Sequence, residues 1–335
     1  MKKRNRVLIL SLLALMAQGW AYSIWAQGSA EAGQKAEKPE EPPLVRFKKT
    51  VSFLQVWYEK NGVIEVIRGT CFFLSVEDER LPKGRSFGYL VTNRHMVEPR
   101  DERGRVLRVV KMSLRVNLVN AANGRQSEEK ELPRDLKWYF HPDDSVDLAA
   151  MPFIPDDAIY DFFSIPLSDA ATKDVIEARR ISEGDKVVYT GYFSQYSGES
   201  KIQPVVREGI IAMMPDERLP TTLNKPGHVY LADVHVFGGN SGSPVLVSLS
   251  GFRGGAVYLG GEYRLLGVVS GYYVERQDLT LQAATTLSGA AKGNSGISIV
   301  VPADQLKALI EQPALKVLRD AEVSRLEASG PPRPK

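Results

Sequence analysis

Three short fragments of this sequence carry residues that could act together as a nucleophilic catalyst. The first ends in His95, the second begins with Asp147, and the third, Gly-Gly-Asn-Ser-Gly-Ser-Pro, contains Ser241. A serine hydroxyl is a poor nucleophile near neutral pH, and an imidazole held by a buried carboxylate is one of the few all-protein ways to activate it. The order histidine, aspartate, serine therefore predicts a serine hydrolase.

The histidine and the aspartate each have rivals in the sequence. His141 is the only other histidine upstream of Asp147, but it precedes Pro142 in a stretch typical of a turn. Asp143 and Asp144 compete with Asp147 for the role of the carboxylate. We prefer Asp147 because the apolar residues directly after it would bury its side chain beside the histidine, where a charge is least screened.

The serine has a rival because Gly-Asn-Ser-Gly occurs twice, at 239–242 and at 293–296. Either copy could be no more than a turn, since these residues tolerate tight backbone geometry. The first copy follows a second glycine and precedes Ser-Pro and an apolar strand. This context favours Ser241 over Ser295 as the nucleophile.

The elements that must position these residues are short β-type runs separated by Gly, Pro, Asn and Asp. Six runs precede the segment 155–183 and six follow it, which predicts an all-β protein with two tandem antiparallel β-barrels. A helical pattern over 304–326, broken at Pro313, predicts two helical pieces that cover the second barrel or an exposed flank. The predicted strands are 51–58, 63–76, 87–91, 106–119, 136–140, 148–153, 186–193, 203–213, 228–234, 244–248, 263–273 and 297–301.

The three motifs, in this order, resemble those of the trypsin/chymotrypsin-like serine peptidases, particularly their bacterial and Htr-type members. The resemblance covers about 51–303 and implies two Greek-key barrels, at 45–154 and 184–303, with the active site between them. A helical segment and tail, 304–335, follow the 45–303 peptidase domain, and no PDZ domain is expected there. The resemblance also implies an oxyanion hole made by the amides of Gly239 and Ser241.

Substrate specificity is less readable from the sequence. The resemblance places the substrate-binding residues at His235, Ser270, Gly271 and Tyr272, without an acidic residue that would attract Lys or Arg. His235 could hydrogen-bond an acidic substrate side chain, Tyr272 could narrow the pocket for a small apolar one, or His235 could simply cap a loop.

Two residues depart from the family pattern. Asn240 stands where the digestive members of the family carry an aspartate that receives a new N-terminal ammonium, so no activation by that route is expected. Arg94 adjoins His95, and its charge could lower the pKa of the imidazole.

The N-terminal region predicts export from the cytoplasm, to a bacterial periplasm or the extracellular space. A basic start and an apolar run indicate that 1–26 is a signal peptide, although 7–26 is also long enough to be an uncleaved membrane anchor. The Ala-, Gly-, Glu- and Pro-rich stretch 27–43 lacks large apolar side chains, which predicts a flexible linker over 27–44.

Composition excludes several other classes of protein. The 43 Lys and Arg residues nearly balance 40 Asp and Glu, so the chain has no nucleic-acid-binding signature. The single cysteine, Cys71, cannot form an intrachain disulfide, and no metal-ligand spacing or cofactor motif is present. A protein or peptide substrate is the expected partner, and the sequence does not indicate an oligomeric state.

Two other functions must be weighed against a serine endopeptidase. One is a binding or scaffold protein that keeps the barrels but lacks turnover. The other is an α/β-hydrolase esterase, which the sequence disfavours because that fold requires the order Ser, Asp, His and a Gly-x-Ser-x-Gly motif.

Overall fold

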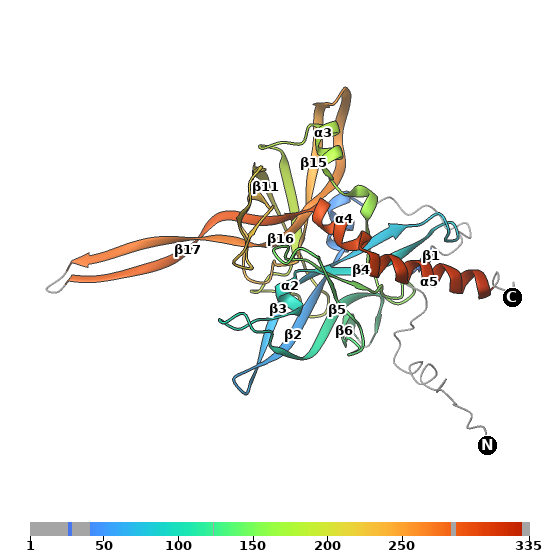
Figure 1. Ribbon diagram of the computed structural model, residues 1–335, viewed down its shortest axis with the longest axis horizontal. Coiled ribbons are helices and arrows are strands. Elements are labelled where there is room, and N and C mark those ends of the chain that lie inside the picture. The colour runs from blue at the N-terminus through green and yellow to red at the C-terminus, as the bar shows by residue number, and fades with distance from the viewer. Residues whose placement is uncertain (1–25, 29–40, 123, 283–285, 330–335) are drawn as a thin grey trace, which may run out of the picture.

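The computed structural model describes residues 26–28, 41–122, 124–282 and 286–329. The protein is mostly β-structure, with helices between its two halves and at its C-terminal end (Figure 1). Residues 1–25 of the predicted signal peptide or membrane anchor and residues 29–40 of the predicted linker lie outside the described residues. None of the helices in the described ranges is long and apolar enough to cross a membrane.

The N-terminal half is one nine-stranded sheet with the strand order β6-β5-β2-β3-β4-β8-β7, and β1 and β9 pair with β4 and β3. Apart from β3 with β9, neighbouring strands in this sheet are antiparallel. The strands are β1 Ala26–Gly28, β2 Val51–Lys60, β3 Val63–Glu77, β4 Arg85–Thr92, β5 Arg108–Ala122, β6 Arg125–Glu131, β7 Tyr139–Phe140, β8 Ala149–Pro152 and β9 Ile165–Pro166.

The C-terminal half is a closed antiparallel barrel with the order β10-β11-β14-β17-β16-β15. Its first three strands run in sequence and the last three return in reverse order, which is the Greek-key connection. A short hairpin, β12 with β13, lies outside the barrel. The strands are β10 Lys186–Gly191, β11 Val205–Met213, β12 Leu219–Pro220, β13 Pro226–Gly227, β14 Tyr230–Asp233, β15 Pro244–Arg253, β16 Ala256–Gln282 and β17 Thr286–Pro302.

These sheets confirm the predicted all-β fold with two antiparallel halves, but the halves differ in closure. The second closes on itself, whereas β6 and β7 form the two ends of the first across the described residues. Strand β7 pairs with β8 through Tyr139↔Ala150 and Phe140↔Ala149 and forms one of these two ends.

Strand β3 shows how the sequence builds two cores at once. Its residues Cys71, Phe72, Phe73 and Leu74 are all fully buried. Because successive side chains of a strand point to opposite faces, Cys71 and Phe73 enter a core within the N-terminal sheet. Phe72 and Leu74 enter a second core, which also contains Leu265 from the C-terminal barrel. The second core therefore joins the two halves.

The C-terminal helices α4, Ala303–Glu311, and α5, Pro313–Ser329, form the two predicted helical pieces, with Pro313 in the first turn of α5. Leu306, Leu309 and Ile310 are fully buried in the core that joins the halves. The helices therefore contact both halves and do not cover the second barrel alone. The remaining helices are α1 Pro43–Lys48, α2 Arg94–Val97, the 3-10 helix η1 Leu167–Asp169 and α3 Lys173–Arg179.

Strands β16 and β17 continue past the barrel as a long two-stranded ribbon (Figure 1). Their pairing extends from Val274↔Asn294 to Gln282↔Thr286. The sequence predicted only 263–273 and 297–301 as strands, and it did not predict β6. The missed segments lack the apolar alternation that marks a strand packed on a core.

Candidate active site

His95 and Asp147 meet although they are far apart in the sequence. His95 lies in the short helix α2, directly after β4, and Asp147 lies in the loop before β8, which pairs with β4. His95 Nδ1 is 2.6 Å from Asp147 Oδ2, and the backbone N–H of His95 donates to Asp147 Oδ1 at 3.0 Å. Asn93 Nδ2 donates to the backbone carbonyl of Asp147 at 2.8 Å, which fixes this loop against α2.

The Asp147 carboxylate is buried, with 1% of the side chain exposed. Burial alone would raise its pKa, but the charge of His95 and several hydrogen bonds favour the ionised form and lower the pKa below its usual value. The carboxylate is therefore charged at neutral pH and can orient the imidazole.

Two hydroxyl groups complete the surroundings of this carboxylate. Ser270 Oγ lies 2.6 Å from Asp147 Oδ2, and Thr222 Oγ1 lies 2.9 Å from the same oxygen. The two hydroxyl oxygens are 2.5 Å apart. Ser270 was predicted only as a substrate-binding residue, and Thr222, between β12 and β13, was not predicted at all. A lone threonine in a loop gives no recognisable sequence signal.

The imidazole of His95 is a suitable general base. About a third of the side chain, 32%, is exposed. Burial lowers its pKa, but the charge and the hydrogen bond of Asp147 outweigh that effect and raise it above its ordinary value. The expectation that Arg94 lowers this pKa is wrong, because the Arg94 guanidinium forms an ion pair with Glu98 at 2.9 Å and stacks on Phe140.

Ser241 lies in the loop between β14 and β15, on the C-terminal barrel. Its hydroxyl donates to the backbone carbonyl of Ser270 at 3.3 Å, and among the described residues it makes no hydrogen bond to His95. Because Ser270 also contacts Asp147, the three predicted catalytic residues surround one segment of β16. A nucleophile and its base are often poorly aligned in structures without substrate.

Thr70 of β3 connects the serine loop to the other half of the molecule. Its N–H donates to the carbonyl of Ser241 at 3.0 Å, and its hydroxyl donates to the carbonyl of Gly239 at 2.9 Å. The same hydroxyl accepts the N–H of Tyr192 at 2.8 Å. A side chain at Gly242, whose φ is +86°, would collide with the Thr70 carbonyl. The loop therefore depends on β3 for its shape.

The predicted oxyanion-hole donors are free to bind. Within the described residues, the amides of Gly239 and Ser241 have no hydrogen-bond acceptor, whereas the intervening Asn240 N–H donates to the Phe237 carbonyl. Gly239 has φ +99°, and a side chain there would collide with Tyr192. Two unused amides in one rigid turn match what an oxyanion requires.

Asn240 has all its polar atoms satisfied inside the protein. Its Nδ2 donates to the Tyr192 carbonyl at 2.6 Å, and its Oδ1 accepts from the Phe237 N–H at 2.8 Å and lies 3.1 Å from the Tyr189 hydroxyl. The neutral amide therefore holds the serine loop through Tyr192, Phe237 and Tyr189.

The predicted substrate-binding residues lie near this loop. Gly271 and Tyr272 follow Ser270 on β16, and a side chain at Gly271 would collide with Thr222. The exposed His235 ring faces Gly296 of β17, where an added Cβ would come within 3.5 Å of it. The rings of His235 and Phe237 are stacked, with centroids 6.4 Å apart.

The residues that competed with His95, Asp147 and Ser241 in the sequence form contacts with other partners. Asp143 pairs with Arg218, and Asp144 pairs with Lys225. His141 Nδ1 accepts the N–H of Asp143. The Ser295 hydroxyl donates to the carbonyl of Tyr273, and the Cys71 thiol is buried with a raised pKa, first because of that burial. None of these four contacts includes His95 or Asp147.

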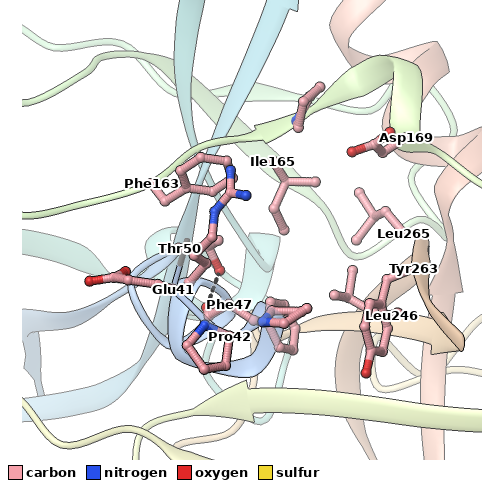
Figure 2. A pocket seen from close by; sticks show the side chains of 14 residues that line it. Glu41, Pro42, Phe47, Thr50, Phe163, Ile165, Asp169, Leu246, Tyr263 and Leu265 are labelled. Carbon is pink, nitrogen blue, oxygen red and sulfur yellow. Dashed lines mark hydrogen bonds between the residues drawn. The ribbon is translucent and has the colours of Figure 1, made fainter. Parts of the chain in front are cut away.

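A hollow of about 620 Å³ opens beside His95, between the loop after α2 and the loop at 222–225. A second hollow, of about 590 Å³, lies between α1, β9 and the strands β15 and β16. Figure 2 shows that apolar side chains such as Phe163, Ile165 and Leu265 surround the second hollow. No predicted catalytic residue lines it, so we place the candidate site at the hollow beside His95.

The described residues contain no group of three or more His, Cys, Asp or Glu positioned to hold a metal ion.

Residues 69–252 match the family of the trypsin-like peptidase domain. This match spans more than half of the 335 residues, so the chain belongs to the trypsin-like peptidase family. The predicted resemblance is thereby confirmed, and the matched residues include His95, Asp147 and Ser241.

Solved structures of two proteins are similar to this chain. The HtrA-type protease AlgW with a decapeptide has a TM-score of 0.43 and 14% identity, covering 84% of this chain and 67% of that one. Deg5 has a TM-score of 0.42 and 13% identity, covering 79% of this chain and 88% of that one. A search of curated proteins found no match.

Proposed function

We propose that the protein is a serine endopeptidase that hydrolyses peptide bonds of proteins or peptides through an acyl-enzyme. The observation that supports this most directly is the His95 and Asp147 pair, joined at 2.6 Å beside the loop that carries Ser241. Family membership supports a peptidase in general, and the two unused amides at Gly239 and Ser241 fit acyl transfer in particular.

In the proposed reaction, Ser241 Oγ attacks the carbonyl carbon of the substrate, and His95 Nε2 takes the hydroxyl proton. The tetrahedral oxyanion accepts hydrogen bonds from the amides of Gly239 and Ser241. His95 then gives its proton to the leaving amine, and the acyl group stays on Ser241. Water attacks this ester with His95 again as the base, which releases the acid and restores the hydroxyl. Asp147 remains ionised throughout and stabilises the imidazolium.

The attack requires a change at Ser241. Its hydroxyl now donates to the carbonyl of Ser270 and must turn toward His95 when substrate binds. Rotation about one side-chain bond connects staggered rotamers and leaves the backbone unchanged. The Thr70 contacts act on backbone atoms of the loop, so they do not oppose that rotation.

The same hydrogen bond favours an alternative function. If Ser241 stayed bound to Ser270, the protein would be a peptide-binding scaffold with a trypsin-like fold and no turnover. A fluorophosphonate probe separates the two functions, because it reacts only with an activated serine. We expect labelling that disappears in Ser241→Ala and persists in the matched variant Ser295→Ala. Absence of labelling in the folded wild-type protein across pH 6 to 9, a span of about three units around the ordinary histidine pKa, would favour the scaffold.

We also propose that the protein acts outside the cytoplasm, in the periplasm or beyond, with 7–26 as a removable signal or a membrane tether. The sequence of 1–26 is the support for this proposal. Fractionation of expressing cells, with mass spectrometry of the mature N-terminus, tests both the location and the cleavage. A full-length chain in the cytoplasmic fraction would contradict export.

A further inference from the structure

Arg207 of β11 and His235 both contact the ring of Phe237, which lies in the serine loop. The guanidinium carbon of Arg207 lies 4.9 Å from the centroid of the Phe237 ring, which also stacks on His235. Arg207 is directly opposite Tyr189 of β10, so the two side chains share a face of the barrel. The Tyr189 hydroxyl contacts the His235 carbonyl at 2.7 Å. Arg207 and His235 are thus linked through the same two aromatic residues, Phe237 and Tyr189.

Arg207 has no anionic partner among the described residues. Its Nε is buried without a hydrogen-bond acceptor. The cations around the hollow beside His95 differ in this respect, because Lys60 pairs with Glu102, Arg94 with Glu98 and Lys225 with Asp144. Arg207 as a whole is half-buried, and its guanidinium also hydrogen-bonds the Tyr189 hydroxyl, which is neutral. A guanidinium with a free donor and no carboxylate beside it is suited to binding an anion.

Arg207 and His235 are connected through Phe237 to the proposed oxyanion loop. Phe237 donates its N–H to the Asn240 side chain and accepts the Asn240 N–H through its carbonyl. Gly296 leaves room for the His235 ring on the opposite wall. An anion bound between Arg207 and His235 would therefore sit close to the residues that hold the reacting carbonyl.

We propose that Arg207 and His235 bind the carboxylate of an aspartate or glutamate side chain on the substrate residue whose carbonyl is attacked. This inference rests on the proposed function, and it names the substrate class for that site. The substrate carboxylate would supply the missing partner of Arg207. Tyr189 and Phe237 position the two basic groups.

The test measures recognition separately from turnover. Fluorescent peptides that differ only in Glu or Gln at one position are titrated against Ser241→Ala, and binding is followed by anisotropy. We expect the Glu peptide to bind at least about tenfold tighter, because a hydrogen bond between two charged groups is stronger than one to a neutral amide. Arg207→Gln in the Ser241→Ala background should remove most of this preference. Arg207→Lys should retain part of it, since it keeps the charge but not the planar fork.

Arg108→Gln is the matched control, because it removes the same charge from an exposed pair with Glu59 in the first sheet. It should leave the preference for Glu unchanged. If Arg207 only supports Phe237, Arg207→Gln will weaken both peptides equally. That result, equal binding of the two peptides to the parent, or binding of neither, would overturn the inference. Loss of fluorophosphonate labelling in the wild type, with the preference for Glu retained, would overturn the proposed function alone.

Discussion

At the scale of single residues, Asp147 determines how the site responds to pH. Its carboxylate accepts hydrogen bonds from His95 Nδ1, from the backbone N–H of His95 and from two hydroxyl groups. These hydrogen bonds keep the carboxylate charged although it is buried. The charge acts on the imidazole and raises the pKa of His95. The state of the base is therefore controlled by a residue that does not itself touch the substrate.

The first prediction concerns the pH dependence of activity. General base catalysis requires neutral His95, so kcat/KM should rise with pH along one acidic limb whose midpoint lies above the ordinary value of 6.5. The limb is measured with a neutral peptide substrate and compared with an NMR titration of the ring in Ser241→Ala. A midpoint below 6.5 by both methods would contradict the raised pKa.

Both pKa shifts add folding stability, but their contributions depend on pH in opposite directions. For His95, the raised pKa adds stability that is present below the unfolded pKa and is lost as pH rises through the folded pKa. For Asp147, the lowered pKa adds stability that is present above the unfolded pKa and is lost as pH falls through the folded pKa. The ion pair is therefore fullest at mildly acidic pH, below the pH at which the base is active.

The second prediction concerns Thr222, a positioning residue. Thr222→Val keeps the shape but removes a hydroxyl next to Asp147 Oδ2. We expect kcat/KM to fall about three- to tenfold, the effect of losing one hydrogen bond of about 1 kcal/mol. The acidic limb should also move to higher pH, because a less satisfied carboxylate attracts the imidazolium more strongly.

Thr221→Val is the control for this experiment, since its hydroxyl donates to the Lys225 carbonyl in the same loop. It should leave the acidic limb in place. An equal displacement in both variants would mean that Thr222 acts only by holding the loop.

At the scale of elements, α5 is fixed to the N-terminal sheet by a buried arginine. Arg319 is 8% exposed, and its Nη1 donates to the Tyr89 hydroxyl at 2.7 Å and to the Ile310 carbonyl at 2.9 Å. Burial raises the pKa of Tyr89 to about 12. The tyrosine therefore stays neutral, and the arginine carries the charge of this contact.

The third prediction follows from that contact. Arg319→Met should lower the free energy of unfolding by about 1 to 3 kcal/mol, because it leaves the buried carbonyl and hydroxyl without their donor. Urea unfolding followed by tryptophan fluorescence measures the change. Arg325→Met, in an exposed pair with Glu322, should cost less than about 1 kcal/mol. Similar losses in the two variants would show that the buried contact contributes little.

The sequence predicted elements where apolar residues alternate or form buried runs, as in β3 and β10. It missed β6, whose residues Arg125–Glu131 are mostly polar, because that strand is stabilised by pairing with β5 and not by a core of its own. It placed α4 and α5 correctly, but helical periodicity does not reveal which surface a helix covers.

At the scale of the whole molecule, the predicted site depends on contacts that only folding creates. His95, Asp147 and Ser241 were predicted because they belong to compact motifs. Thr222, Thr70 and Arg207 were not, because their roles depend on neighbours that are distant in sequence. The hydrogen bond of Ser241 to Ser270 was also beyond prediction, since a rotamer is set by its surroundings.

The fourth prediction concerns the ribbon of β16 and β17. Replacing 276–292 with an Asn-Gly turn between Glu275 and Gly293 should leave the barrel folded and keep fluorophosphonate labelling within about threefold. The barrel pairs of these strands, such as Gly271↔Ile299, and the contact of Asn294 with the Val236 carbonyl remain in this variant. Such turns suit two-residue hairpin connections.

Labelling rate and melting temperature are compared with those of the full chain. Loss of labelling with an intact melting transition would show that the ribbon reaches the active site. An isolated two-stranded ribbon is marginally stable at best in water, so a second chain is one partner that could stabilise it. A lower molar mass of the shortened variant than of the full chain, measured by light scattering, would identify the ribbon as a contact between chains.

The contacts of Thr70 have one more consequence. This residue belongs to the first lobe, yet it holds the turn that bears Ser241 in the second. If the lobes were synthesised as two polypeptides, the second could still pack its own interior, but its reactive turn would lack the outside brace. Neither fragment alone would then react with a fluorophosphonate. Reassociation of the two fragments would restore the position of the Ser241 hydroxyl and its reactivity. The two halves could therefore serve as a split reporter, in which serine reactivity appears only when the two fragments associate.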